Sequence, residues 1–209
     1  MCPMCLPPHR PSPRTLTLAG GLRLCIRAVT PEDRQRLLDG LRSITEETSY
    51  HRFFTPAFYP SEAELRYLTE VDYEQHVAVG AVDCTRDGEP GIGVARYIRL
   101  DDVPSVAEAA VLVVDAYQRR GIGSLLLAAL SRYAAAHGVH RFRAYVLQEN
   151  EPFLDYLREL GAGNEYTRDG IVQVDLPVYT DPESVPDTSA TARARWAWQQ
   201  LDEAREGGC

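Results

Sequence analysis

Apolar residues at alternate positions predict several strands along this chain. Leucine or isoleucine at positions 22, 24 and 26 alternates with arginine or cysteine at 23, 25 and 27, which is typical of a strand. Further strands are expected over residues 76–82, 93–100, 107–114, 141–147 and 171–176. After Glu108 the stretch 107–114 is apolar throughout, as expected of a strand that is covered on both faces.

Capping signals predict helices between these strands. Thr30-Pro31-Glu32-Asp33 opens one that continues to about residue 43, and Ser61 with Glu64 forms a capping box for a second that ends near 70. A longer helix runs from Ile122 to the stop at residues 137–138, and a short one covers about 152–160. The aromatic stretch 50–54 shows no clear period. This alternation of strands and helices predicts an α/β or α+β fold.

The ends of the chain differ from its centre in composition. Residues 1–20 are rich in proline and arginine and are expected to form a disordered tail, followed by one domain over 21–178. Residues 179–209 form a C-terminal tail with an expected helix near 190–206, which holds both tryptophans, Trp196 and Trp198. Docking of this helix against the domain is favoured over a partner site.

The charged residues exclude several classes of enzyme and binding protein. All 22 basic residues are arginine, so the 209 residues contain no lysine for a Schiff base or a Walker A phosphate loop. The absence of lysine has two explanations that the sequence does not separate. One is the codon usage of a GC-rich genome, and the other is a lysine-modifying enzyme that lacks its own target side chain. The net charge of −8 argues against nucleic-acid binding and suits a cationic substrate.

Membrane and metal sites are not expected. No apolar run reaches the ~20 residues of a membrane span, and Met1–Pro13 lacks the apolar core of a signal peptide, so a cytoplasmic location is expected. Cys2 and Cys5, with His9, have partial zinc spacing but lack a second ligand pair.

The most informative segment is residues 111–124, where an apolar strand leads through a glycine turn into a helix. Gly121 and Gly123 allow a ligand close to the backbone, and the free N–H groups of the helix start favour an anion. Arg119 and Arg120 add positive charge beside them. A Rossmann fingerprint does not fit, because Leu126 takes its third glycine position. The turn fits Gln/Arg-x-x-Gly-x-Gly/Ala, and a pyrophosphate would suit it.

With these motifs, residues 22–176 resemble the GNAT superfamily of acyl-CoA-dependent N-acyltransferases. The resemblance implies a mixed, mostly antiparallel sheet flanked by helices on both faces, with acetyl-CoA as co-substrate. It places the pyrophosphate at the turn, the pantetheine arm along the strand before it, and Asn150 against that arm. The candidate cofactor-binding residues are Val111, Leu112, Val113, Gln118, Arg119, Arg120, Gly121, Ile122, Gly123, Ser124 and Asn150.

A narrower likeness is to bacterial protein-lysine acetyltransferases. It is carried by the segments 52–54, 68–73, 107–108 and 147–150. In that branch a glutamate ten positions before the motif glutamine is the general base, and Glu108 stands there. The alternative for Glu108 is a solvated carboxylate at a strand end that pairs with an arginine.

One position departs from the family. Many members have a tyrosine seven residues after the asparagine to protonate the leaving thiolate, but here Leu157 takes that place and Tyr156 precedes it. A one-residue slip turns a helical side chain by about 100°, so core packing is expected of Tyr156.

Three interpretations remain open from the sequence. The first is a protein-lysine N-acetyltransferase, the second an N-acetyltransferase for a small amine, and the third a non-catalytic acyl-CoA-binding module.

Overall fold

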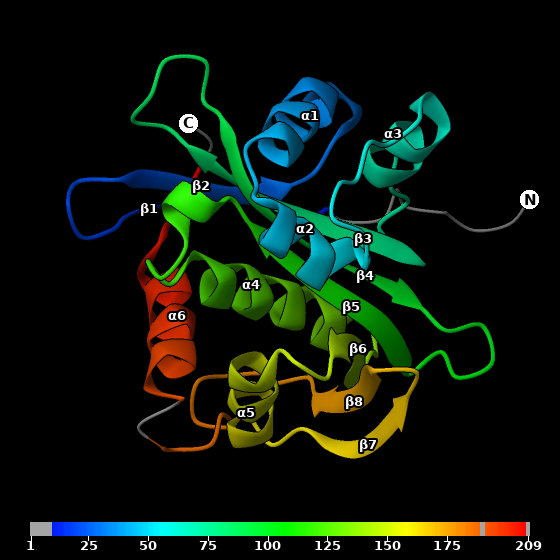
Figure 1. The fold of residues 1–209 in the computed structure, drawn as a ribbon. Coiled ribbons are helices and arrows are strands. Elements are labelled where there is room, and N and C mark those ends of the chain that lie inside the picture. Colours follow the sequence, from blue (N-terminus) through cyan, green and yellow to red (C-terminus); the bar gives the residue numbers. More distant parts are fainter. Residues whose placement is uncertain (1–9, 189–190, 208–209) are drawn as a thin grey trace, which may run out of the picture.

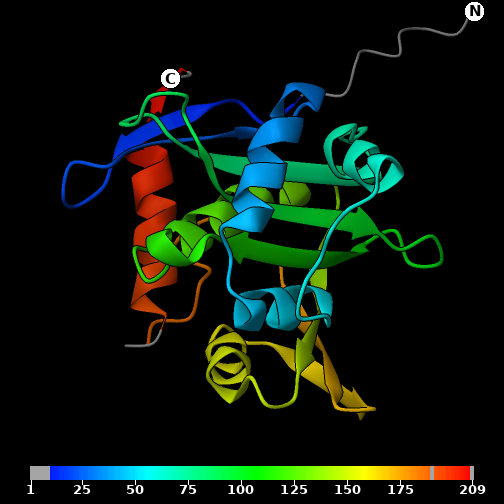
Figure 2. The same ribbon diagram turned by 45° about the horizontal axis from the view of Figure 1, so that its top comes forward.

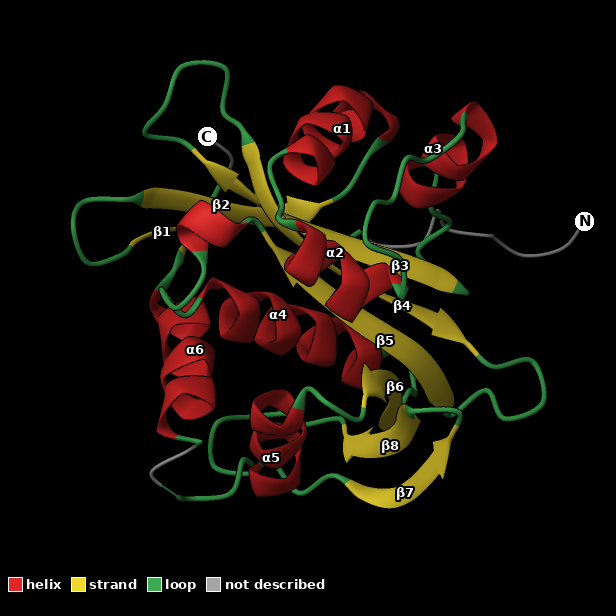
Figure 3. Ribbon diagram, in the orientation of Figure 1, coloured by secondary structure: helices red, strands yellow, loops and turns green. Residues whose placement is uncertain are grey.

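A single nine-stranded sheet organises the chain, whose computed structural model describes residues 10–188 and 191–207 (Figures 1 and 3). The strand order is β7-β8-β6-β5-β4-β3-β2-β1-β9. In chain order the strands are β1 (Arg14–Thr17), β2 (Arg23–Ala28), β3 (His76–Asp83), β4 (Gly91–Arg99), β5 (Val106–Val113), β6 (Arg141–Leu147), β7 (Gly163–Arg168), β8 (Ile171–Pro177) and β9 (Arg205–Glu206).

The sheet is antiparallel except at one pair of strands. β5 and β6 run parallel, and their pairing covers only Val106–Glu108 against Arg141–Arg143. β5 remains paired with β4 along its whole length, and β6 with β8. The two halves of the sheet therefore part at Glu108, which leaves one edge of β5 open from Ala109 onward.

Helices cover both faces of the sheet, as expected. They are α1 (Arg34–Arg42), α2 (Glu46–Phe53), α3 (Glu62–Thr69), α4 (Ile122–Ala136), α5 (Glu151–Glu159) and α6 (Ala192–Glu203). Neighbouring strand residues face opposite ways. Val94 lines a cavity with residues of α1, whereas a Cβ on Gly93 would meet Leu126 of α4, so α1 and α4 lie on opposite faces (Figure 2).

The predicted strands and helices are all present, and the elements that were not predicted have physical causes. Residues 14–17 were expected in a disordered tail, but they form β1 because Leu16 is buried and the strand pairs with both β2 and β9. The rest of that expected tail up to residue 9 lies outside the described residues. The aperiodic segment 50–54 belongs largely to α2, and β7 was not predicted because five of its six residues are exposed.

α6 lies within the range expected to be helical and stands beside α4 (Figure 1). Its buried side chains are Ala194, Ala197, Trp198 and Leu201. Arg132 of α4 forms an ion pair with Asp202 and also lies 5.1 Å from the Trp198 ring. The helix is thus docked on the domain.

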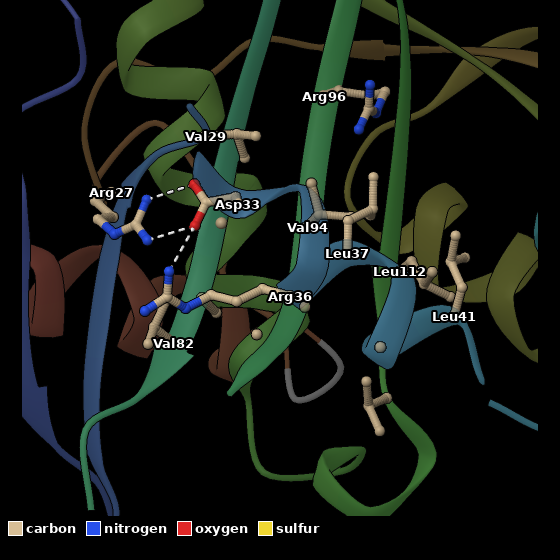
Figure 4. A pocket seen from close by; sticks show the side chains of 16 residues that line it. Arg27, Val29, Asp33, Arg36, Leu37, Leu41, Val82, Val94, Arg96 and Leu112 are labelled. Carbon is tan, nitrogen blue, oxygen red and sulfur yellow. Dashed lines mark hydrogen bonds and ion pairs between the residues drawn. The ribbon is translucent and has the colours of Figure 1, made fainter. Parts of the chain in front are cut away.

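A small apolar cavity of about 60 Å³ separates α1 from the sheet (Figure 4). At one side Asp33 accepts hydrogen bonds from Arg27 at 2.6 and 2.7 Å and faces Arg36 at 3.4 Å. Burial opposes the charge on Asp33, but the hydrogen bonds from Arg27 and from the Thr30 backbone outweigh it and lower the pKa of Asp33. These ion pairs fasten the first turns of the α1 segment over the sheet, while apolar packing further along is incomplete.

Replacing Gly40, in the last turn of α1, with alanine should stabilise the protein. The new Cβ would stand 3.5 Å from the Gly91 carbonyl oxygen and 3.8 Å from Val114 Cγ2, which are ordinary contacts at the edge of the cavity. Alanine also removes the helix penalty of glycine, so the free energy of unfolding should rise by about 0.5–1 kcal/mol in urea denaturation.

Gly91→Ala is the matched control, since its Cβ would stand only 3.1 Å from Arg36 Cβ. It should bring no such gain. A loss of stability in Gly40→Ala would contradict this description of the cavity.

Candidate active site

The parting of β5 and β6 opens a cavity of about 730 Å³. Its wall includes β5 from Glu108 to Val113, the first residues of α4 and the side chains of Thr48, His51 and Arg52 from α2. The apolar residues 109–113 were expected to be covered on both faces, yet they are only half-buried, because one side of the strand faces this cavity. The volume is in the range of small-molecule sites.

The glycine turn brings an anion-binding helix end to this cavity. Gly121 has φ +84°, a left-handed conformation that favours glycine, and α4 follows at once. Within α4 the N–H of Leu125 donates to the Gly121 carbonyl at 3.0 Å. The N–H groups of residues 122–124, in the first turn of α4, have no partner within the helix and can bind a ligand.

The side chain of Gln118 is held inside the turn. Its Nε2 donates to the Val113 carbonyl and to Asp115 Oδ1, both at 3.1 Å. Asp115 also accepts the Thr45 N–H at 2.8 Å and the Thr48 hydroxyl at 2.6 Å. Asp115 therefore ties the start of α2 to the turn, and Gln118 supports the loop rather than reaching into the cavity with a free amide.

Glu108 is an exposed carboxylate where the two strands part. Arg52, at the last turn of α2, lines the same cavity. Burial lowers the pKa of the Arg52 guanidinium, and the Glu108 carboxylate opposes that shift. The cavity therefore contains the Glu108 carboxylate, which can accept a proton, and the Arg52 guanidinium, whose positive charge repels other cations.

A more deeply buried cation, Arg96, lies close enough to Arg52 for the two charges to interact. Arg96 is 6% exposed, and burial together with the charge of Arg52 lowers its pKa to about 10. Its Nη1 is 3.2 Å from Nε2 of His76, and its Nη2 donates to the Leu68 carbonyl at 3.3 Å. Burial and the charge of Arg96 lower the pKa of His76 to about 4, so His76 is neutral in the folded protein at neutral pH.

The cavity gathers nearly all the residues that the sequence predicted for the site. The predicted residues that line it are Glu108, Val111, Leu112, Val113, Gln118, Arg119, Gly121, Ile122, Gly123, Ser124 and Asn150. Arg120 is the exception, because its guanidinium lies 5.5 Å from the Tyr117 ring and does not line the cavity.

The structure shows where the side chains of Leu157 and its neighbour Tyr156 lie. Leu157 is 3% exposed and belongs to the core. Tyr156 packs against the core as expected, but it also lines the cavity, and its hydroxyl is 3.4 Å from Ser124 Oγ. Leu157 also lines the cavity, so an apolar side chain and the Tyr156 hydroxyl both face it from α5.

Several lining residues were not predicted as site residues. His51 and Arg52 were missed as site residues because the helix that carries them has no apolar period. Thr45 as N-cap, followed by Glu46 and Glu47 in the first turn, was the available signal for that helix. Arg193 comes from the tail, which the sequence did not connect to the site.

The described part of the chain contains no group of three or more histidine, cysteine or acidic residues that could hold a metal ion. Cys2, Cys5 and His9 lie outside the described residues. Over residues 10–188 and 191–207, no helix is long and apolar enough to cross a membrane.

Comparison with known proteins adds independent information. The family described as "Acetyltransferase (GNAT) domain" matches residues 23–162. A curated relative, Acetyltransferase Pat of Mycolicibacterium smegmatis, is 39% identical over 158 residues, which make up 73% of this chain and 45% of the relative.

Two solved structures have the same fold. The GNAT domain of S. lividans PAT superimposes with a TM-score of 0.69 at 28% identity, over 79% of this chain and 96% of that one. A cAMP-binding acyltransferase from Mycobacterium smegmatis superimposes with a TM-score of 0.56 at 30% identity, over 92% of this chain and 55% of that one. This chain spans about half the length of both mycobacterial proteins.

His76 should make the protein less stable in mild acid. Its pKa is about 4 when folded against 6.5 for a free histidine, so between these values the unfolded chain binds the extra proton. The free energy of unfolding should fall as the pH drops from 6.5 to 4, by an amount on the order of 3 kcal/mol. His76→Gln keeps an acceptor for Arg96 and removes the titration, so urea denaturation at a series of pH values should show a flatter slope.

Carboxylates with a lowered pKa, such as Asp33, also make the protein less stable on acidification, and the wild type and His76→Gln share that contribution because His76 does not act on Asp33. Equal slopes for the wild type and His76→Gln would contradict the assignment to His76.

Proposed function

The chain belongs to the acetyltransferase (GNAT) domain family, and from that premise we propose that it transfers the acetyl group of acetyl-CoA to the ε-amine of a protein lysine, with Glu108 as general base. The observation that carries this proposal is the position of Glu108, which stands where β5 and β6 part and lines the same cavity as the start of α4.

The residues of the cavity fit acetyl-CoA. The open edge of β5 from Ala109 to Val113 offers main-chain groups to an extended pantetheine arm. At about 3.3 Å per residue, Glu108 and Val113 are ~17 Å apart along the strand, so the reacting end and the phosphate end of a long ligand are well separated. The free N–H groups at the start of α4 would hold the pyrophosphate, with Arg119 beside them.

Glu108 supplies the proton acceptor that the reaction needs. A lysine amine has a pKa near 10.4 in water, so only about one in a thousand is neutral and nucleophilic at pH 7. As the amine nitrogen attacks the thioester carbonyl, a C–N bond forms, the C–S bond breaks, and the amine proton passes to Glu108 directly or through water. CoA leaves as a thiolate, and since a thiol has a pKa of about 8.5 this needs no enzyme acid. The charge of Arg52 disfavours an ammonium ion nearby and so favours the neutral amine.

Three observations support a protein lysine as the acceptor. The resemblance to bacterial protein-lysine acetyltransferases rests on segments that include Arg52 and Glu108, and both residues line the cavity. The relative named Acetyltransferase Pat is 39% identical. A net charge of −8 suits a basic protein surface as well.

Thiol release from acetyl-CoA, measured with a panel of proteins and of small amines, tests the proposal. Acceptor-dependent release should appear with lysine-bearing proteins and should fall at least tenfold in Glu108→Gln, because a positioned base contributes roughly 10²–10⁴-fold. The 209 residues hold no lysine, so acetyl-lysine found by mass spectrometry of an untagged reaction comes from the acceptor alone.

Glu159→Gln is the matched control, since it removes the same charge from an exposed site on α5 away from the cavity lining. Equal activity in Glu108→Gln and Glu159→Gln would remove the base assignment. Release with small amines only would identify a small-amine acetyltransferase, and tight binding without release would point to a non-catalytic module.

Gly123→Leu tests where the pyrophosphate binds. A Cβ at Gly123 would meet only Val113 Cγ2, at 3.7 Å, so the larger side chain should extend into the cavity without disturbing the core. Acetyl-CoA binding by calorimetry should weaken at least tenfold, while the thermal unfolding temperature stays within about 2 °C of the wild type. Unchanged affinity would place the pyrophosphate elsewhere.

A further inference from the structure

We propose that α6, at the C-terminal end of the described chain, completes the acyl-CoA site, with Arg193 as a phosphate-binding residue. The inference rests on the proposed use of acetyl-CoA. The family match ends at residue 162, so it carries no expectation for this helix.

α6 is seated directly on the glycine turn. If Gly121 carried a Cβ, that atom would stand 2.6 Å from Trp196 Cζ3 and 3.2 Å from Trp196 Cη2, so the indole ring lies flush against this glycine. Arg193 precedes Trp196 by three residues and therefore lies on the same side of the helix. Arg193 lines the cavity together with Arg119 and Gly121.

The guanidinium of Arg193 has no carboxylate partner among the described residues. In the described part of the chain it has no hydrogen-bond or ion-pair partner, whereas Arg195, two residues on, pairs with Asp187 at 2.5 Å. Arg193 also stands in the first turn of α6, which contains no acidic residue. A cation at a helix N-terminus is unfavourable against the positive end of the helix dipole, and a bound anion would relieve it.

The end of the cavity near the glycine turn is therefore positively charged, whereas the protein as a whole is negatively charged. Arg119 and Arg193 both line it without a partner among the described residues, in a chain whose net charge is −8. Glu108 stands at the far end of β5, about 17 Å along the strand from Val113. The phosphates of CoA, either the pyrophosphate or the ribose 3′-phosphate, are the anionic groups that a bound acyl-CoA would bring to this cavity.

The experiment compares three acetyl donors in wild type, Arg193→Ala, Arg193→Lys and Arg195→Ala. Acetyl-CoA carries all phosphates, acetyl-dephospho-CoA lacks the 3′-phosphate, and S-acetylpantetheine has none. Arg193→Ala should raise the Kd of acetyl-CoA about five- to twentyfold, as expected for the loss of one charge-assisted hydrogen bond, and Arg193→Lys should recover part of it. Arg195→Ala, with the same change in charge, should stay within about twofold.

The donors separate phosphate binding from a structural role. With S-acetylpantetheine, kcat/KM should be the same in wild type and Arg193→Ala, because there is no phosphate to contact. A loss that disappears with acetyl-dephospho-CoA assigns the 3′-phosphate, and one that persists assigns the pyrophosphate. Equal losses with all three donors, or equal Kd values for Arg193→Ala and Arg195→Ala, would overturn the inference. A wild type that binds no acetyl-CoA would instead overturn the proposed function, and this inference with it.

Discussion

The site depends on the point at which two parallel strands stop pairing. β5 stays bonded to β4 and β6 stays bonded to β8, while β5 and β6 are held together only from Val106 to Glu108. Backbone N–H and C=O groups left open in this way are costly unless water or a ligand satisfies them. The separation of β5 and β6 therefore creates both the cavity and the unpaired main chain that an extended ligand can use. Glu108 stands where the separation begins.

The walls of this opening are fixed by polar contacts that span long stretches of sequence. Asp115 joins the turn after β5 to Thr45 and Thr48, which start α2, so the helix that brings Arg52 to the cavity is held by the same loop that precedes α4. On the other side Trp196 lies against Gly121. Residues from the first quarter, the middle and the end of the chain thus set the shape of one site.

Sequence reasoning succeeded where periodicity and capping agree, and it failed where tertiary contacts decide. The glycine turn was predicted from its own pattern and Glu108 from the resemblance to bacterial protein-lysine acetyltransferases, and the structure brings both to one cavity. α2 was missed because the side chains that it turns toward the cavity, Thr48, His51 and Arg52, are polar, so no apolar 3.6-residue period marks the helix. β1 was missed because Leu16 is buried only through its pairing partners. The contact of Tyr156 with the cavity depends on how α5 is rotated against the core, and the approach of Arg193 depends on α6 docking, so neither could be predicted from the sequence.

The central claim is that acetyl-CoA occupies the opening between β5 and β6 with its thioester beside Glu108. The most direct measurement is the position of the CoA sulfur in a crystal structure of the complex. We expect that sulfur next to the Glu108 end of β5, with the pyrophosphate against the first turn of α4. CoA bound in another place, such as the surface around α1, or β5 and β6 fully paired along their length in the complex, would contradict it.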